Sequence, residues 1–230
     1  MTLQEKVRLL SLVDVLEPLP GPALERFAAR TPTLHVRRGQ LFHTPARRSG
    51  PFLLLLEGRV RIYKEAAGRE FTLGIVDAGA LAGEEALTAQ QLQGVYARAV
   101  EPSTVAIVPA EQLRSLINEE PEVGMKAIQL LSERLSAYGE RLADLGLKEV
   151  RPRVASLVSQ LVRSEGVVSR AGYRIPTRYT HEDLAAMVGA GRVAVTRALA
   201  GLREAGYLEL RDRYLHVNDL EALERAARGS

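Results

Sequence analysis

The spacing of apolar residues divides the chain into a helical beginning, a middle of short strands and a helical end. Five apolar residues near the N-terminus share one helical face and predict a helix to about residue 16: Leu9, Leu10, Leu12, Val13 and Leu16. The proline-rich stretch 18–22 interrupts this helix. Pro22 is expected to begin a second short helix that reaches Arg30, because proline fits the first turn of a helix.

From about Thr33 to Pro109 the pattern changes: apolar and polar residues alternate with a period of two, or apolar residues form short runs. Short apolar runs such as Phe52–Leu56 and Phe71–Val76 are separated by turns that contain glycine. Many short strands at near-regular intervals are typical of a β-sandwich or barrel. We therefore expect a β-domain in the first half of the chain.

After Pro109 the pattern is helical, with a short helix at Glu111–Asn118 and a longer one from Pro121 to about Leu147. In the longer helix two apolar series repeat every seven residues, three residues apart: Ile128, Leu131, Leu135, Tyr138, Leu142 and Leu145. Such spacing predicts a coiled-coil seam between two copies of the chain. The alternative is an amphipathic helix that lies on its own domain, because Val123, Ala127 and Leu130 widen the apolar stripe. The persistence of the heptad spacing favours dimerisation.

Gly146 and Pro152 bracket a predicted hinge. Pro152 is expected to be the first residue of the next helix, which places Arg151 before it, outside the α region. The helix that follows has an apolar face between Val154 and Val162. Residues Val167–Arg178 are expected to form a loop or a short hairpin.

The region after Thr180 carries the strongest functional pattern. Thr180 is a candidate N-cap, with Asp183 three residues later, for a helix over Glu182–Val188. Gly189 supplies a left-handed turn position, and a second helix is expected from Gly191 to Arg203. A short helix, a glycine turn and a longer helix are typical of the helix-turn-helix motif.

The second helix presents a polar face beside its apolar one. Its inward positions are expected to be Val195, Ala198, Leu199 and Leu202. The exposed face then holds Arg192, Val193, Thr196 and Arg197. Two arginines near the start of a recognition helix suit the O6 and N7 atoms of guanine in the major groove. A lone arginine is usually a solvated surface group, but this set in a two-helix frame favours DNA.

A β-hairpin is expected after the second helix. Tyr207–Leu210 and Tyr214–Val217 alternate around Arg211, Asp212 and Arg213. Such a hairpin would form the wing of a winged helix-turn-helix, and Arg211 and Arg213 at its tip suit contact with phosphate.

The charge distribution agrees with a polyanionic partner at the C-terminal end. Residues 1–150 hold 18 Lys and Arg against 19 Asp and Glu, whereas residues 151–230 hold 13 against 9. The formal net charge of +3 therefore resides in the last third of the chain. Most basic residues are arginines, a bias that a GC-rich genome also produces.

Composition excludes several classes of protein. The 46% share of hydrophobic residues is enough to bury a core. The absence of cysteine excludes disulfides, thiolate zinc sites, cysteine nucleophiles and cysteine-ligated iron–sulfur clusters. We see no secretory leader at the N-terminus and no apolar run long enough to cross a membrane, so we expect a cytoplasmic protein.

No common enzyme motif is present: G-x-S-x-G, H-E-x-x-H, the P-loop and G-x-G-x-x-G are all missing. We therefore expect a protein that is not an enzyme and needs no metal or cofactor. A ligand-sensor module that does not bind DNA is the alternative from another class. The two-helix frame on the basic third of the chain argues against that alternative.

Strands, a heptad helix and a winged helix-turn-helix, in this order, resemble the CRP/FNR family of bacterial transcription regulators. Tyr179–Gly189 and Arg192–Leu199 resemble the family pattern T-x-x-E/D-L/I-A followed by G-x-S/T-R-E-T-V-x-R-x-L. Gly83-Glu84 also matches the family's effector-pocket segment, and Val150–Ala155 matches the start of its DNA-binding domain. The resemblance implies an α+β fold with an N-terminal double-stranded β-helix, or jelly roll, over residues 1–120. A dimerisation helix over 121–147 and a winged helix-turn-helix over 148–230 would follow.

By this resemblance the protein is a homodimer that binds a two-fold-symmetric site on double-stranded DNA. The resemblance also implies contact with RNA polymerase and, usually, activation, with repression as the alternative. Arg192 and Arg197 would read bases, and Thr180 and His181 would contact phosphate.

One departure from the family pattern falls on the recognition helix, where Val193 replaces the usual glutamate. Glutamate accepts a hydrogen bond from the amino group of cytosine, whereas valine packs on the methyl group of thymine. We therefore expect a changed half-site at that base pair.

The other departures concern the effector. The family's cyclic-nucleotide binders hold the phosphate with an Arg-Ser pair, where this chain has Gln93-Gly94, although Glu84 is retained. The Thr-Ser that meets adenine is replaced by Tyr138-Gly139. A neutral glutamine cannot balance a buried phosphate, so cAMP is not expected. Two hypotheses stay open: an unidentified small ligand beside Glu84, Gln93, Gly94 and Tyr138, or activity without an effector, which we favour.

Overall fold

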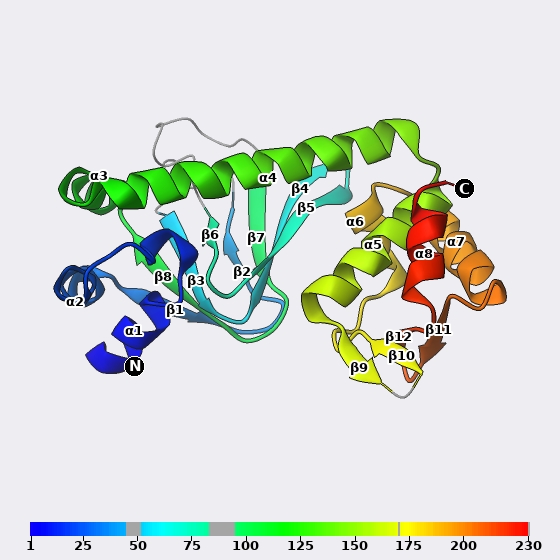
Figure 1. Ribbon diagram of the computed structural model, residues 1–230, viewed down its shortest axis with the longest axis horizontal. Helices are drawn as coiled ribbons and strands as arrows, with labels where there is room; N and C mark the ends of the chain where they lie inside the picture. The colour runs from blue at the N-terminus through cyan, green and yellow to red at the C-terminus, as the bar shows by residue number, and fades with distance from the viewer. Residues whose placement is uncertain (45–51, 83–94, 170, 230) are drawn as a thin grey trace. The chain divides into compact units, whose positions relative to one another are not determined.

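The structure is a computed structural model that describes residues 1–44, 52–82, 95–169 and 171–229 (Figure 1). The chain forms two compact units, Met1–Ser136 and Ala137–Ser230. The boundary between them falls inside the longest helix, α4 (Pro121–Leu147).

The N-terminal unit begins with two short helices, α1 (Leu3–Leu10) and α2 (Gly21–Arg30). The expectation of one helix to residue 16 was wrong, because α1 ends at Leu10 and a separate 3₁₀ turn covers Asp14–Leu16. The backbone N–H of Asp14 donates to the Gly79 carbonyl, which holds this turn against the β-domain. The turn buries its apolar residues without a continuous helix and leaves Leu12 63% exposed.

Two four-stranded antiparallel sheets follow, with strand orders β1-β8-β3-β6 and β2-β7-β4-β5 (Figure 1). The strand bounds are β1 Thr33–Val36, β2 Leu41–His43, β3 Phe52–Glu57, β4 Arg59–Ala66, β5 Arg69–Asp77, β6 Leu81–Ala82, β7 Val95–Ala99 and β8 Ser103–Val108. The two sheets enclose an apolar core that includes Leu55, Val60 and Val105. Of the two forms that the pattern predicted, a sandwich or a barrel, the described residues form a sandwich, and β2 and β6 are the strands of these sheets that were not anticipated.

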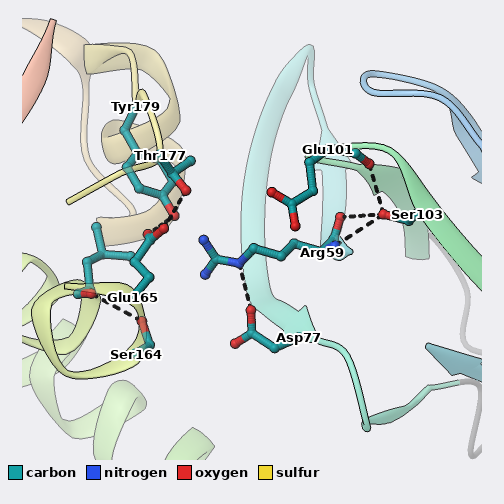
Figure 2. A network of polar contacts seen from close by, with 9 residues as sticks. Arg59, Asp77, Glu101, Ser103, Ser164, Glu165, Thr177 and Tyr179 are labelled. Carbon is teal, nitrogen blue, oxygen red and sulfur yellow. Dashed lines mark hydrogen bonds and ion pairs between the residues drawn. The ribbon is translucent and has the colours of Figure 1, made fainter. Parts of the chain in front are cut away.

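A second apolar cluster packs helices onto the first sheet. Phe52 and Val108 from its strands meet Leu10 of α1, Phe27 of α2 and Leu113 of α3 (Ala110–Glu119). The β4–β5 pair is joined at its end by Arg59, whose Nε donates to Asp77 Oδ1 at 2.6 Å, while Ser103 Oγ accepts from its backbone N–H (Figure 2).

Helix α4 begins as part of this cluster. Val123 and Ala127 are buried there, as expected for a helix that lies on its own domain. Farther along, the heptad positions are exposed: Ile128 is 58%, Leu135 72% and Leu142 68% exposed, and Tyr138 is 38% exposed. The first turns of α4 therefore lie on their own domain, and three heptad residues farther along, Ile128, Leu135 and Leu142, are each more than half exposed in the protomer.

After the end of α4, the described residues of the C-terminal unit form four helices beside a four-stranded sheet with strand order β11-β12-β10-β9. The helices are α5 Val150–Glu165, α6 His181–Val188, α7 Arg192–Glu204 and α8 Leu220–Ala227. The strands are β9 Val167–Ser169, β10 Gly172–Arg174, β11 Leu208–Arg211 and β12 Tyr214–Val217. The hairpin of β9 and β10 confirms one of the two forms expected for Val167–Arg178. Helix α8 was not expected, although Asp219 caps it by accepting from the Ala222 N–H at 2.8 Å.

The predicted start of α5 was wrong. The helix begins at Val150, so Arg151 is helical and Pro152 is the third helical residue. Proline is tolerated there because the first-turn N–H groups have no acceptor within the helix. In the part of the chain that the structure describes, no single helix is long and apolar enough to cross a membrane, and α6 and α7 meet that test only when joined across a bend of 101°.

Candidate nucleic-acid interface

Helix α6 is fixed at both ends by local hydrogen bonds. Thr180 and Asp183 form the predicted capping box: Thr180 Oγ1 accepts from the Asp183 N–H at 3.1 Å, and Asp183 accepts from the Thr180 N–H at 2.8 Å. At the other end Gly189 has φ of 65°, the left-handed conformation that glycine adopts without strain. The N–H of Ala190 then donates to the Ala185 carbonyl at 3.1 Å. The predicted helix–glycine turn–helix frame is confirmed.

Two arginines hold the C-terminal carbonyls of α6, a part of any helix whose carbonyls find no donor within the helix itself. Arg153 of α5 donates through Nη1 to the Val188 carbonyl at 2.9 Å, and Arg141 in the last part of α4 donates through Nη2 to the Met187 carbonyl. Burial lowers the pKa of the Arg141 guanidinium from its ordinary value. Neither contact was predicted, because the position of an arginine in the sequence does not show which carbonyl its side chain reaches.

The segment that leads into α6 is held by one carboxylate. Glu165, the last residue of α5, accepts hydrogen bonds from the hydroxyls of Thr177 and Tyr179, the latter at 2.6 Å (Figure 2). These contacts fix the segment directly before the cap at Thr180. The orientation of α6 is therefore set by α5 through both Glu165 and Arg153.

Helix α7 has the two faces that its sequence predicts. Its buried residues are Val195, Ala198, Leu199 and Leu202. Arg192, Val193 and Arg197 are exposed on the other side, and Val193 is 72% exposed.

The structure brings together two of the residues expected to touch DNA. His181 Nδ1 and Thr196 Oγ1 are 2.8 Å apart, which joins the first residue of α6 to the middle of α7. The Thr196 hydroxyl is thus engaged within the protein, whereas Arg192, Val193 and Arg197 project from the exposed side of α7. The Thr180 hydroxyl is also engaged, since it donates to Asp183 at 2.6 Å.

The wing is a tight hairpin between β11 and β12. Asp212 and Arg213 have φ values of 51° and 67°, as the two central residues of a type I′ turn require. Arg213 lies at the tip, and Arg211 forms an ion pair with Glu209 at 2.5 Å. Of the two wing arginines expected to meet phosphate, Arg211 therefore already has a counter-ion.

A pocket lies between the two sheets of the N-terminal unit. Its described lining is entirely apolar: Phe42, Leu53, Leu55, Val60, Ile62, Val76, Ala82 and Val105. The candidate contacts Glu84, Gln93 and Gly94 lie outside the described residues, and Tyr138 lies on α4 in the C-terminal unit. The part of the lining that is described contains no side chain that could bind a phosphate.

Known protein families match both units. Residues 152–226 match the Crp-like helix-turn-helix domain, and residues 33–120 match the cyclic nucleotide-binding domain. The chain is 30% identical over 176 residues to a CRP-like cAMP-activated global transcriptional regulator of Mycobacterium tuberculosis, a match that covers 76% of this chain and 79% of the relative. It is 28% identical to the global nitrogen regulator of Synechocystis sp., over 74% of this chain and 77% of the relative.

Solved structures show the same architecture. A transcriptional regulator of the CRP/FNR family from Thermus thermophilus superimposes with a TM-score of 0.72 at 25% identity, covering 86% of this chain and 98% of the other. The c-di-GMP-responsive global regulator CLP of Xanthomonas campestris shares the fold with a TM-score of 0.77 at 23% identity, over 86% of this chain and 99% of the other.

Proposed function

The chain belongs to the CRP/FNR family of transcription regulators, and on that premise we propose that it is a homodimer that binds palindromic promoter sites. The observation that carries this proposal is the face of α7, where Arg192, Val193 and Arg197 project from a rigid two-helix frame. A helix inserted in the major groove reads base edges with such side chains. The basic wing would meet the adjacent phosphates.

The exposed heptad stripe of α4 supports the dimer. Ile128, Leu135 and Leu142 lie on successive heptads and are each more than half exposed. Leu131, Tyr138 and Leu145 complete the seam that we assign to the interface. Two copies joined along this stripe would present two α7 helices, which matches a palindrome with one half-site per protomer.

Val193 bears on the base sequence of each half-site. Its side chain can contact the thymine methyl group but can accept no hydrogen bond from a cytosine amino group. We propose that Arg192 and Arg197 read guanines, and that Val193 selects thymine between them. His181 and Arg213 would contact phosphate, and Thr180, Thr196 and Arg211, which are engaged within the protein, would contribute through the positions they hold.

We propose that the protein does not respond to cAMP, in contrast to the relative whose name describes it as cAMP-activated. The apolar pocket lining and the uncharged Gln93-Gly94 support this proposal. A phosphate removed from water without a cation is unfavourable. We favour activity without an effector, and an unidentified small ligand in the β-domain is the second candidate.

We further propose that the protein acts in the cytoplasm as an activator that contacts RNA polymerase, with repression as the alternative. Transcription in vitro with purified polymerase, on a template that carries the binding site, separates the two. Added protein would raise transcript yield in the first case and lower it in the second.

Selection from a random-sequence DNA pool by the purified protein tests the central proposal. We expect a palindrome with thymine at the Val193 position, recovered at moderate salt without any added metabolite. Recovery of sequences without two-fold symmetry would contradict the dimeric arrangement. Dependence of binding on a cell-extract metabolite would contradict effector independence.

A further inference from the structure

Two arginines of the C-terminal unit share one aromatic ring. The guanidinium carbons of Arg174 and Arg178 lie 5.0 and 4.7 Å from the centre of the Tyr214 ring. Arg174 ends β10, Tyr214 begins β12, and Arg178 lies in the segment that leads to α6. The cluster therefore joins three separate parts of the winged helix-turn-helix.

The cluster lies on the face of the sheet that points away from the core. Leu215 and Val217 of β12 are buried, so Tyr214 and His216 point the other way. Arg174 is directly opposite His216 in the register of β10 and β12, and residues that are directly opposite share a face. This face also carries Arg211, which is opposite Tyr214 in the β11–β12 pair.

The N-terminal unit also places two arginines beside one tyrosine ring, there a buried one. Arg61 and Arg98 lie 4.7 and 5.0 Å from the centre of the Tyr63 ring, and Glu70 pairs with them at 2.5 and 3.4 Å. That carboxylate balances the two guanidinium charges. Around Tyr214 no carboxylate among the described residues lies within ion-pair distance of Arg174 or Arg178.

The missing counter-ion indicates what the cluster can bind. The two guanidinium groups are at most about 10 Å apart, because both contact one ring, and like charges at this range repel. Stacking on a ring leaves the N–H edges of a guanidinium free to donate, and these edges match the oxygens of a phosphate. An external phosphate would supply the charge that Glu70 supplies at Tyr63.

We propose that Arg174, Arg178 and Tyr214 form a second phosphate-binding site, which contacts the DNA backbone outside the half-site that α7 reads. This inference rests on the proposed DNA binding and extends it to a longer bound duplex. Arg178 is two residues before the cap of α6, and Tyr214 follows the wing tip at Arg213. The cluster thus adjoins two elements that already face the DNA in the proposed complex.

The test compares two duplexes by fluorescence anisotropy. Both carry the same selected palindrome, but one ends at the palindrome and the other extends by about ten base pairs of random sequence on each side, roughly one helical turn. The variants are the double substitution Arg174→Gln with Arg178→Gln and the single substitution Tyr214→Leu. The control is Arg225→Gln on α8, which makes the same kind of substitution, with the loss of one positive charge per protomer, at an arginine that pairs with Glu221 at 3.9 Å.

We expect the double variant to bind the long duplex about tenfold or more weakly than the wild type, and the short duplex equally well. Four lost phosphate contacts per dimer would reduce the slope of log K against log salt by about 3–4 on the long duplex. Tyr214→Leu would give a smaller loss on the long duplex only, and Arg225→Gln would change neither. Thermal unfolding of each variant verifies that the fold is retained.

Several outcomes would overturn the inference. Equal losses on both duplexes would place the arginines within the half-site, and no loss on either would remove them from the interface. Unchanged DNA affinity together with weakened binding of an acidic protein such as RNA polymerase would identify a protein surface instead. If the wild type selects a palindrome and only the flank dependence is missing, the proposed function stands and this inference fails. If the wild type binds no DNA, both fail.

Discussion

The substitution Leu135→Glu should separate the proposed dimer into folded monomers. Leu135 is 72% exposed in the protomer and occupies the middle of the heptad stripe on α4. Complete burial of a leucine side chain stabilises by about 1.5–3 kcal/mol, so covering this exposed part contributes roughly 1–2 kcal/mol per copy. The dimer contains the residue twice, which gives about 2–4 kcal/mol. A glutamate loses this contribution and adds the cost of placing a charge in an apolar seam.

The expected effect on association is large and measurable. A loss of about 2–4 kcal/mol raises the dimer Kd about 30- to 1,000-fold. Analytical ultracentrifugation at micromolar concentration would then report the monomer mass of 25.2 kDa instead of twice that value. Affinity for a full palindrome should fall in parallel, because each monomer engages one half-site. Affinity for an isolated half-site should change little.

Ala143→Glu is the matched control. Ala143 is also exposed on α4 but lies one residue after the heptad position Leu142, off the seam. The substitution introduces the same charge into the same helix and should leave the dimer intact. If Leu135→Glu remains dimeric, or if both variants dissociate equally, the heptad stripe is not the interface. A lower unfolding temperature for monomeric Leu135→Glu alone would be expected from the lost association.

Three further predictions concern the DNA-reading unit and the pocket. Arg197→Ala should cost about 1–3 kcal/mol on the selected palindrome and relax the preference at one base pair, whereas an equal loss on all DNA in gel-shift assays would make Arg197 a phosphate contact. Val193→Glu should restore a preference for cytosine where the wild type selects thymine, and selection that again returns thymine would refute the assignment of Val193 to a base. Isothermal titration calorimetry should detect no cAMP binding to the wild type, and a micromolar Kd would overturn the argument from the uncharged Gln93-Gly94.

Helices and strands whose apolar residues repeat at a regular spacing were predictable from the sequence. The alternation in the β-domain and the buried side of α7 both follow from the spacing of apolar residues, because burial selects one face of an element. Gly189 was predictable for a different reason, since a left-handed residue is needed between two closely joined helices.

The ends of helices, and helices too short to show a repeat of apolar residues, were less predictable. Leu12 belongs to an apolar series but is 63% exposed, because α1 ends early and the chain turns to reach Gly79. Helix α8 was missed although Leu220, Leu223 and Ala227 show helical spacing and Asp219 could have been recognised as its cap. Its short length gave the period too few repeats to stand out.

Polar contacts between elements were not predictable from one sequence. Thr196 was assigned to DNA because it falls on the expected outer face of its helix, and His181 was assigned by the family resemblance. Only the crossing of α6 and α7 shows that they meet at 2.8 Å. The same holds for Arg141, which belongs to no apolar pattern and reaches a carbonyl 46 residues away in the sequence.

These contacts connect dimerisation with DNA reading in the proposed complex. Arg141 projects from α4 one residue before the seam residue Leu142, and its guanidinium holds the last turn of α6. The opposite end of α6 is joined to α7 through His181 and Thr196. Helix α6 therefore links the end of α4 to α7, through the Arg141 contact at its C-terminal end and the His181 contact at its N-terminal end. Because paired α4 helices would fix the distance between two such assemblies, the seam would determine which half-site spacing the dimer accepts.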